Sequence, residues 1–442
     1  MPHHAESPQP IALTTQARRR AIVASVIGNG LEWFDFGIYG MFAVIIARQF
    51  FPADDPLTPL LMAGATFGLA FLARPVGGVL IGLYADRAGR KAALTRVMLL
   101  MAVGTGMIGL IPPYSAIGIA APLLLVAARL LQGLSTGGEF ASATAMLFEY
   151  AGPHRRGLVG SFQMCSQALG FGLGGGIAWL LSSALSAAEL ADWGWRLPFL
   201  LGLLIGPVGH YIRARVDESP EFTAWLRDRR PRPRSAILTL LREHPRALLV
   251  ALGIVIAGTA SSYVVLIYIP VFGSTQFGVS IATSQLAVFV GCTCLFVLCP
   301  LTGHLSDRYG RAPVMLTGIL LHAALAYPLL AGLIAAPGAA RLIAYEVAAC
   351  VLMSLFWGPT PSALAEAFPV DLRSTAVSLA YNLGVMIFGG LAPFFCTWLT
   401  RVSGNPVAPA WYLVVTGLTG ALALIARRRH YMAEAPPAPA SR

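Results

Sequence analysis

Long, continuously apolar segments follow one another along almost the whole chain, and short polar stretches separate them. Residues 116–128, for example, include no charged side chain. About 20 apolar residues in a helix span the hydrocarbon core of a bilayer, whereas membrane barrels show segments of about ten alternating residues. Only 12% of the 442 residues are charged, against about 25% in soluble domains. The chain is therefore predicted to be an α-helical membrane protein, and a water-soluble enzyme is excluded.

The apolar runs, cut at proline, glycine and charge clusters, predict twelve spanning helices in two halves of six. They are expected near residues 21–50, 58–84, 93–112, 117–151, 157–185, 195–213, 246–274, 281–305, 312–334, 340–367, 374–400 and 408–427. Proline and glycine predict helix breaks at residues 358–361 and 389–393.

A polar stretch divides the two halves. We expect a cytoplasmic N-terminal tail at 1–20, a six-helix bundle at 21–213, a cytoplasmic linker at 214–245, a second six-helix bundle at 246–427 and a cytoplasmic C-terminal tail at 428–442. The linker is basic, so it is expected to be solvated and to touch anionic lipid headgroups.

The net charge of +11 would favour a nucleic-acid partner in a soluble protein. Here most basic residues fall before the first predicted helix, in the linker and in every second loop, while the intervening loops hold only Arg341 and Arg401. This distribution is the positive-inside pattern of membrane proteins. We therefore expect both termini in the cytoplasm and no nucleic acid as a partner.

One loop motif occurs twice, after the second and after the eighth predicted helix. The first copy reads GLYADRAGRK from Gly82, and the second reads GHLSDRYGR from Gly303. A glutamate and an arginine also recur with a common spacing, as Glu149 with Arg156 and as Glu366 with Arg373. Two independent repeats favour a duplicated six-helix unit, which is typical of transporters that rock about a central site.

The duplicated motif is expected to form a gate on the cytoplasmic side. Its glycines allow close packing around a two- to three-residue turn, its aspartates can cap the following helix, and its arginines can pair with the two glutamates. Ordinary capped loops are the alternative. The predicted gate residues are Gly82, Asp86, Arg87, Gly89, Arg90, Glu149, Arg156, Gly303, Asp307, Arg308, Gly310, Arg311, Glu366 and Arg373.

Five ionisable side chains of the first half lie at membrane depth, where charge is costly and indicates a function. They are Glu32, Asp35, Arg74, Arg129 and Glu139. Three acids and two arginines leave one acid without a cation, and such an acid favours its protonated form in a low dielectric. We expect proton coupling through Asp35 and Glu32, with Glu139 next. A closed salt-bridge network among the five is the alternative.

The rest of the expected substrate site is arginine, amide and aromatic. Arg74 and Arg129 can bind a carboxylate bidentately. The further candidates are Tyr39, Gln132 and Gln163 in the first half and Tyr263, Tyr268, Trp357, Tyr381 and Asn382 in the second. Packing is the alternative role for the aromatic residues. The sequence contains no metal-ligand cluster, nucleotide-binding loop or nucleophile arrangement, so no cofactor is expected and the proton gradient would drive transport.

Five strings carry a family resemblance: NGLEWFDFGIYG from Asn29, FLARPVGGVLIG from Phe71, RLLQGLSTGGEF from Arg129, WGWRLPF from Trp193 and DESPEF from Asp217. With the duplicated loops, they resemble the major facilitator superfamily and, within it, the metabolite:proton symporter family. The resemblance implies a multi-pass bacterial inner-membrane protein with twelve helices. It also implies that the helix-1 acids and the two arginines lie in the central cavity. Family members carry citrate, α-ketoglutarate, shikimate, dicarboxylates, or proline and betaine.

The expected function is proton-coupled uptake of a small organic acid by alternating access. A di- or tricarboxylate such as citrate or α-ketoglutarate is the expected substrate, because two intramembrane arginines favour an anion over a zwitterion. The tail after Tyr431 also lacks the charged extension of the osmosensing proline/betaine members. A proline/betaine symporter, a proton-coupled exporter and a non-transporting receptor are the alternatives. We expect a functional monomer in contact with membrane lipid.

Overall fold

The computed structural model describes residues 15–55, 57–88, 90–152, 154–204, 207 and 236–434. All regular structure among these residues is helical. Most of the predicted linker, most of the N-terminal tail and half of the C-terminal tail lie outside the described residues, as does Gly89.

The helices of the first half are α1 (Thr15–Met41), α2 (Ala43–Phe50), α3 (Leu57–Ala88), α4 (Arg90–Leu110), α5 (Tyr114–Ile117), α6 (Ala120–Ser135), α7 (Glu139–Tyr150), α8 (Arg156–Ala184), α9 (Ala187–Asp192), η1 (Gly194–Arg196), α10 (Leu197–Leu201) and η2 (Gly202–Leu204). Those of the second half are α13 (Ala236–Glu243), α14 (Pro245–Tyr263), η3 (Val264–Tyr268), α15 (Ile269–Gln276), α16 (Ile281–Tyr309), α17 (Arg311–Ala335), α18 (Ala339–Trp357), α19 (Thr360–Glu366), α20 (Val370–Gly384), η4 (Val385–Gly389), α21 (Ala392–Ser403) and α22 (Ala408–Glu434).

These elements account for the twelve predicted spans. Within the described residues, nine continuous or slightly broken helices are long and apolar enough to cross a membrane. The α1–α2 pair, bent by 60°, makes a tenth. Two shorter apolar helices, Arg96–Leu110 and Gly194–Leu204, lie where the third and sixth spans are predicted. The fold is therefore the all-helical membrane architecture expected from the sequence.

Several spans are interrupted near the middle of the bundle. The prolines at 359 and 361 separate α18 from α19, and η4 lies between α20 and α21, as predicted. The expected helix at 117–151 is instead divided into α6 and α7. Gly137 and Gly138 explain this break, since glycine is a poor helix former and the Gly137 backbone lies directly against Arg74 and Gly78 of α3.

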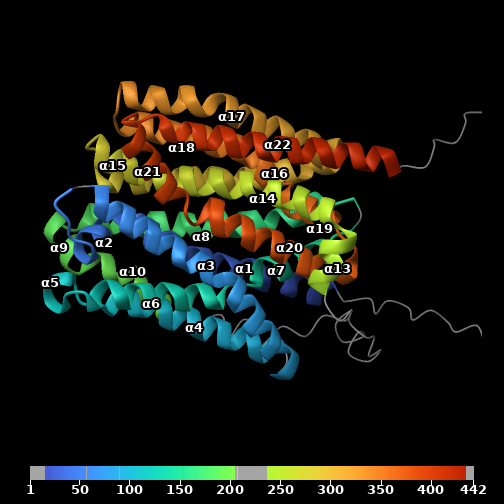
Figure 1. The fold of residues 1–442 in the computed structure, drawn as a ribbon, viewed down its shortest axis with the longest axis horizontal. Coiled ribbons are helices and arrows are strands. Elements are labelled where there is room, and N and C mark those ends of the chain that lie inside the picture. The colour runs from blue at the N-terminus through green and yellow to red at the C-terminus, as the bar shows by residue number, and fades with distance from the viewer. Residues whose placement is uncertain are drawn as a thin grey trace, which may run out of the picture.

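The helices run side by side along the long axis of the molecule (Figure 1). In this view the first half, blue to green, lies largely below the second half, yellow to red. The main contact across the halves is made by α8 and α16, and α8 also packs along α1. We call the end where α16 ends and α8 begins the gate end, and the other end, with α2, α9 and α15, the opposite end.

Candidate functional site

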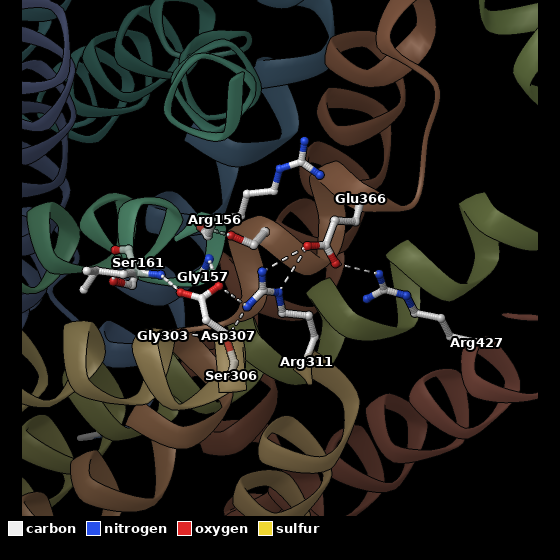
Figure 2. A network of polar contacts seen from close by, with 11 residues as sticks. Arg156, Gly157, Ser161, Gly303, Ser306, Asp307, Arg311, Glu366 and Arg427 are labelled. Carbon is white, nitrogen blue, oxygen red and sulfur yellow. Dashed lines mark hydrogen bonds and ion pairs between the residues drawn. The ribbon is translucent and has the colours of Figure 1, made fainter. Parts of the chain in front are cut away.

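Asp307, at the end of α16, caps the first turn of α8 in the other half (Figure 2). Its two carboxylate oxygens accept hydrogen bonds from the backbone N–H groups of Gly157, at 2.7 Å, and Leu158, at 3.0 Å. Negative charge at a helix N-terminus is favoured by the unsatisfied N–H groups and the helix dipole. The expectation that Asp307 caps the following helix is therefore wrong, because it closes the interface between the halves instead.

Glu366, at the end of α19, lies between two arginines at the gate end (Figure 2). Arg311 donates to its Oε1 from Nη2 at 3.1 Å, and Arg427 of α22 approaches its Oε2 at 3.4 Å. Arg311 also donates to Asp307 at 2.8 Å. Arg311 thus joins the α8 cap to Glu366, which makes one ionic network of α8, α16, α17, α19 and α22.

Two glycines bring the halves into backbone contact beside this network. A Cβ atom on Gly303 would lie 2.6 Å from the Gly157 carbonyl oxygen, so neither helix tolerates a side chain there. The Ser362 hydroxyl of α19 donates to the Arg156 carbonyl at 2.6 Å. Gly310 forms the whole connection between α16 and α17, with a φ of +88° that favours glycine. The observed turn is therefore one residue long, shorter than the predicted turn of two to three residues.

The arginines of the two recurring Glu and Arg pairs lie over the same aromatic ring. The guanidinium groups of Arg156 and Arg373 lie 4.5 and 4.8 Å from the Phe148 ring centroid. Arg373 also donates to the Ala365 carbonyl at 2.8 Å, and exposed Arg308 lies over Tyr309. In the first motif copy, Gly82, Asp86 and Arg87 lie within α3 and Arg90 begins α4, while Glu149 lies within α7.

Contacts also join the halves at the opposite end. Arg401, at the end of α21, lies 3.6 Å from Asp55, whose carboxylate accepts from the Leu57 and Thr58 N–H groups at the start of α3. Gln285 of α16 donates to the Met41 carbonyl at 3.2 Å. The structure therefore has its two halves in contact at both ends.

In the centre of the first half, Glu32 of α1 and Arg74 of α3 form a buried ion pair. Arg74 also donates to the Thr136 hydroxyl at 2.9 Å, at the break between α6 and α7. The rings of Trp33, Phe36 and Phe71 surround its guanidinium within 5.7 Å. A buried charge needs such partners, and Arg74 has them here.

A hydrogen-bonded chain joins the other buried acid to the other arginine. The Thr105 hydroxyl lies 2.6 Å from Asp35 Oδ2, Gln132 Nε2 donates to that hydroxyl at 2.7 Å, and Arg129 donates to Gln132 Oε1 at 2.8 Å. Asp35 and Arg129 are each 0% exposed. Asp35 Oδ1 and Arg129 Nε have no hydrogen-bond partner among the described residues. The two charges thus communicate through two neutral side chains and make no direct ion pair.

Two small cavities lie between the halves, and residues of both halves line each of them. Trp33, Tyr263, Trp357 and Tyr381 are among the residues that line the first, and Tyr39, Phe67 and Tyr268 line the second. The Phe67 and Tyr263 rings, one from each cavity, pack edge to face at 5.8 Å and separate them. Each cavity offers about 30 Å³ to water centres, room for about two waters, so an organic acid requires the halves to separate.

Three further predicted residues are not among those that line the two cavities. Gln163 donates to Asn29 at 3.0 Å and holds α8 on α1, while Asn382 donates to the Gly137 carbonyl at 2.6 Å and holds α20 on the α6–α7 break. Glu139 is partly exposed in the first turn of α7, where the helix dipole favours an acid. Glu139 is not a member of the Asp35–Thr105–Gln132–Arg129 chain.

Sequence reasoning missed Thr105, Thr136, Arg427 and Glu346. Thr136 lies seven residues after Arg129, on the same helix face, which was a signal in the sequence. Thr105 lies in an apolar run, so only its folded contacts identify it. The sequence did contain a signal for Glu346, which is the single charged residue in the apolar run 342–365. A charged residue at membrane depth indicates a function, and such residues were considered only in the first half.

Comparison with known proteins agrees with this architecture. The family of sugar (and other) transporters matches residues 20–237 and 227–426. The chain is 35% identical over 410 residues to the proline/betaine transporter of Escherichia coli K12, covering 91% of this chain and 82% of that one. It is 35% identical over 407 residues to the citrate-proton symporter of Klebsiella pneumoniae, covering 92% and 91%.

Solved structures share the fold at low sequence identity. The xylose transporter XylE of E. coli, in a partially occluded inward-open conformation, aligns with a TM-score of 0.71 at 18% identity, covering 94% of this chain and 98% of that one. Another structure of XylE, a proton:xylose symporter of the major facilitator superfamily, aligns with a TM-score of 0.73. The chain therefore belongs to the sugar (and other) transporters of the major facilitator superfamily, as a multi-pass membrane transporter.

Proposed function

We propose that this transporter is a symporter that takes up a small organic acid, such as citrate or α-ketoglutarate, together with protons. The observation that carries the proposal is the Asp35–Thr105–Gln132–Arg129 chain. It links a buried acid that can accept a proton to a buried arginine that can bind a carboxylate.

The charge balance explains why proton and anion would bind together. With Glu32 paired to Arg74, the second acid, Asp35, offsets Arg129. Protonation of Asp35 removes that negative charge and leaves Arg129 with a net positive field in a low dielectric. A substrate carboxylate restores neutrality. Binding of one ligand therefore lowers the cost of binding the other, which is the reciprocity that coupling requires.

Thr105 can report the protonation state of Asp35 to Gln132. Its hydroxyl has one proton and lies within hydrogen-bond distance of both Asp35 Oδ2 and the Met101 carbonyl, at 2.6 and 3.0 Å. When Asp35 is ionised, Thr105 donates to it. When Asp35 is protonated, the acid can donate to Thr105, whose own proton turns to Met101. Gln132 donates to Thr105 in both arrangements. The chain of hydrogen bonds therefore persists, while the donor and acceptor between Asp35 and Thr105 are reversed.

The gate-end network would hold the cytoplasmic side closed in part of the transport cycle. Opening this side breaks the Asp307 cap and the Ser362 contact, while opening the other side breaks the Arg401–Asp55 pair. We assign the gate end to the cytoplasm of a bacterial inner membrane from the positive-inside pattern. This places both termini inside. A monomer contains every group that the mechanism uses.

A proline- or betaine-type zwitterion is the second candidate substrate. The aromatic residues Trp33, Tyr263, Trp357 and Tyr381 line the first cavity, and aromatic faces bind quaternary ammonium groups. A zwitterion could place its carboxylate toward Arg129 and its ammonium group among these rings. The equal 35% identities to a citrate and a proline/betaine transporter support both candidates.

Uptake by the purified protein in liposomes tests the proposal. Labelled citrate, α-ketoglutarate, proline and glycine betaine are offered with and without an inward proton gradient. An electroneutral symporter moving one proton should accumulate its substrate about tenfold per pH unit. Gradient-driven accumulation of proline or betaine alone would select the zwitterion, accumulation under an outward gradient would select an exporter, and no accumulation of any compound would reject symport of these substrates.

A further inference from the structure

Glu346 of α18 is a fully buried acid in the second half, and the proposed mechanism does not use it. It is 0% exposed. Neither of its carboxylate oxygens has a hydrogen-bond partner among the described residues, and no cationic side chain there forms an ion pair with it. Burial of an ionised carboxylate without any partner is strongly unfavourable.

The surroundings of Glu346 fit a proton and exclude a metal ion. The acid lies at the interface with α16, where a Cβ atom on Gly291 would be 3.6 Å from Glu346 Cβ and 2.9 Å from Cys350 Sγ. Its titratable neighbours are Cys292 of α16 and Tyr345 and Cys350 of α18. Hard cations need several oxygen ligands, and the described residues contain no group of three or more His, Cys, Asp or Glu side chains that could hold a metal ion.

The other elements that pack against α18 add no charge near Glu346. These are α14, α17, α19 and η3. His322, a titratable residue of α17, is buried without an electrostatic contact to it. A carboxylic acid held neutral still has an O–H donor and two acceptor oxygens. A conformation that admits water to the α16–α18 interface would satisfy them.

Helix α16, which packs against Glu346, extends to the gate end. α16 carries Gly291 beside Glu346, and 16 residues later it carries Asp307, a separation of about 24 Å along the helix. α16 also packs against α8 of the first half. Opening the gate end separates Asp307 from α8, and movement of α16 would alter the packing around Glu346.

We propose that Glu346 is a second proton-binding site, which holds a proton while α16 and α18 are packed together and releases it when this interface admits water. This inference extends the proposed proton-coupled function. It assigns the second half a titratable group of its own, at the interface between α16 and α18.

Infrared spectroscopy tests the proton directly, without any substrate. The full-length protein is titrated in lipid, and the carbonyl band of protonated carboxylic acids is compared with that of Glu346→Gln. Wild type should show one extra band that declines reversibly as the pH rises. An identical spectrum in the variant, or a band that never responds to pH, would overturn the proposal.

Transport supplies the second readout. Glu346→Gln mimics the protonated acid in shape, so a structural role predicts wild-type accumulation, whereas a coupling role predicts about a tenfold loss of gradient-driven accumulation with exchange retained. Glu346→Asp should restore coupling with a shifted pH profile. Cys350→Ala, which alters the same contact without removing an acid, should stay within about twofold of wild type.

Unchanged accumulation in Glu346→Gln would refute the coupling role. If wild type accumulates none of the offered compounds, the proposed symport fails, and the infrared titration still decides whether Glu346 holds and releases a proton.

Discussion

The centres of the two halves handle buried charge in different ways. In the first half, Glu32 pairs with Arg74, and Asp35 is joined to Arg129 through Thr105 and Gln132. In the second half, Glu346 has no such partners among the described residues, and the residues that line the first cavity from this half carry no charge. The first half therefore holds compensated charges that can exchange partners, while the second supplies an uncharged cavity lining and a lone acid.

This difference assigns a separate task to each half. Exchange of ionic partners suits binding of a charged ligand, because each lost contact is replaced and little net charge is buried. Aromatic walls add contact area and exclude water with few polar groups. We therefore expect that substitutions of the buried charged residues change coupling and affinity, whereas those at the contacts between the halves change the conformational equilibrium.

The largest effect is expected from Asp35→Asn. The amide keeps the shape and the hydrogen bond to Thr105 but cannot exchange a proton, so gradient-driven accumulation should fall to the level without a gradient. Exchange of labelled for unlabelled substrate should persist. Uptake and counterflow in the same liposomes measure both quantities.

Glu139→Gln is the matched comparison for Asp35→Asn. It neutralises an acid that is partly exposed at the start of α7 and is not a member of the Asp35–Thr105–Gln132–Arg129 chain. Accumulation should remain within about twofold of wild type. Wild-type accumulation in Asp35→Asn, together with loss in Glu139→Gln, would reverse the assignment of the proton carrier.

The fold could be predicted from the sequence more completely than the site could. Continuous apolar runs identify membrane spans because each span must satisfy its own backbone hydrogen bonds. The prolines at 359 and 361 likewise predict a helix break, because proline disrupts a helix through its own backbone geometry. The partner of Asp307 could not be predicted, since it is the first turn of a helix in the other half. Thr105 and Gln132 also acquire their role only through packing of α4, α6 and α1.

The next largest effect is expected from Arg129→Lys. Lysine keeps the charge but loses the planar fork that binds a carboxylate through two parallel hydrogen bonds. Loss of one charge-assisted hydrogen bond costs about 1.5–3 kcal/mol, so the half-saturation concentration should rise at least about tenfold. Initial rates over a substrate series measure this change.

Arg196→Lys provides the control for a general loss of arginine. Arg196 donates to the carbonyls of Gly109 and Ile111, at 3.0 and 2.7 Å, away from both cavities. Its replacement should lower thermal stability with little effect on substrate affinity. Equal losses of affinity in both variants would remove Arg129 from the binding site.

Asp307→Ala should loosen the interface at the gate end by a smaller amount. Loss of a helix cap costs about 1 kcal/mol, which corresponds to about a fivefold shift in the closed-to-open ratio. A cysteine placed at Ser362, in a protein whose native cysteines are replaced, reports opening through its alkylation rate. The rate should rise about fivefold, whereas Arg341→Ala at the opposite end should leave it unchanged. An equal rise in both variants would show general destabilisation.

The smallest effect is expected at Asp55, where the opposite end meets solvent. Hydrogen bonds from the Thr58 hydroxyl and the Leu57 N–H group hold the pKa of Asp55 below its ordinary value, and Arg401 adds to the shift. Because the folded-state pKa is depressed, the stabilising contribution is present above the ordinary pKa of about 3.9 and is lost as the pH falls through the lower, folded value. Asp55→Asn should therefore lower the thermal midpoint slightly at neutral pH, and the difference from wild type should vanish in strong acid. A difference that stays constant across this range would mean that the Asp55 carboxylate charge contributes nothing to the contact between α3 and α21.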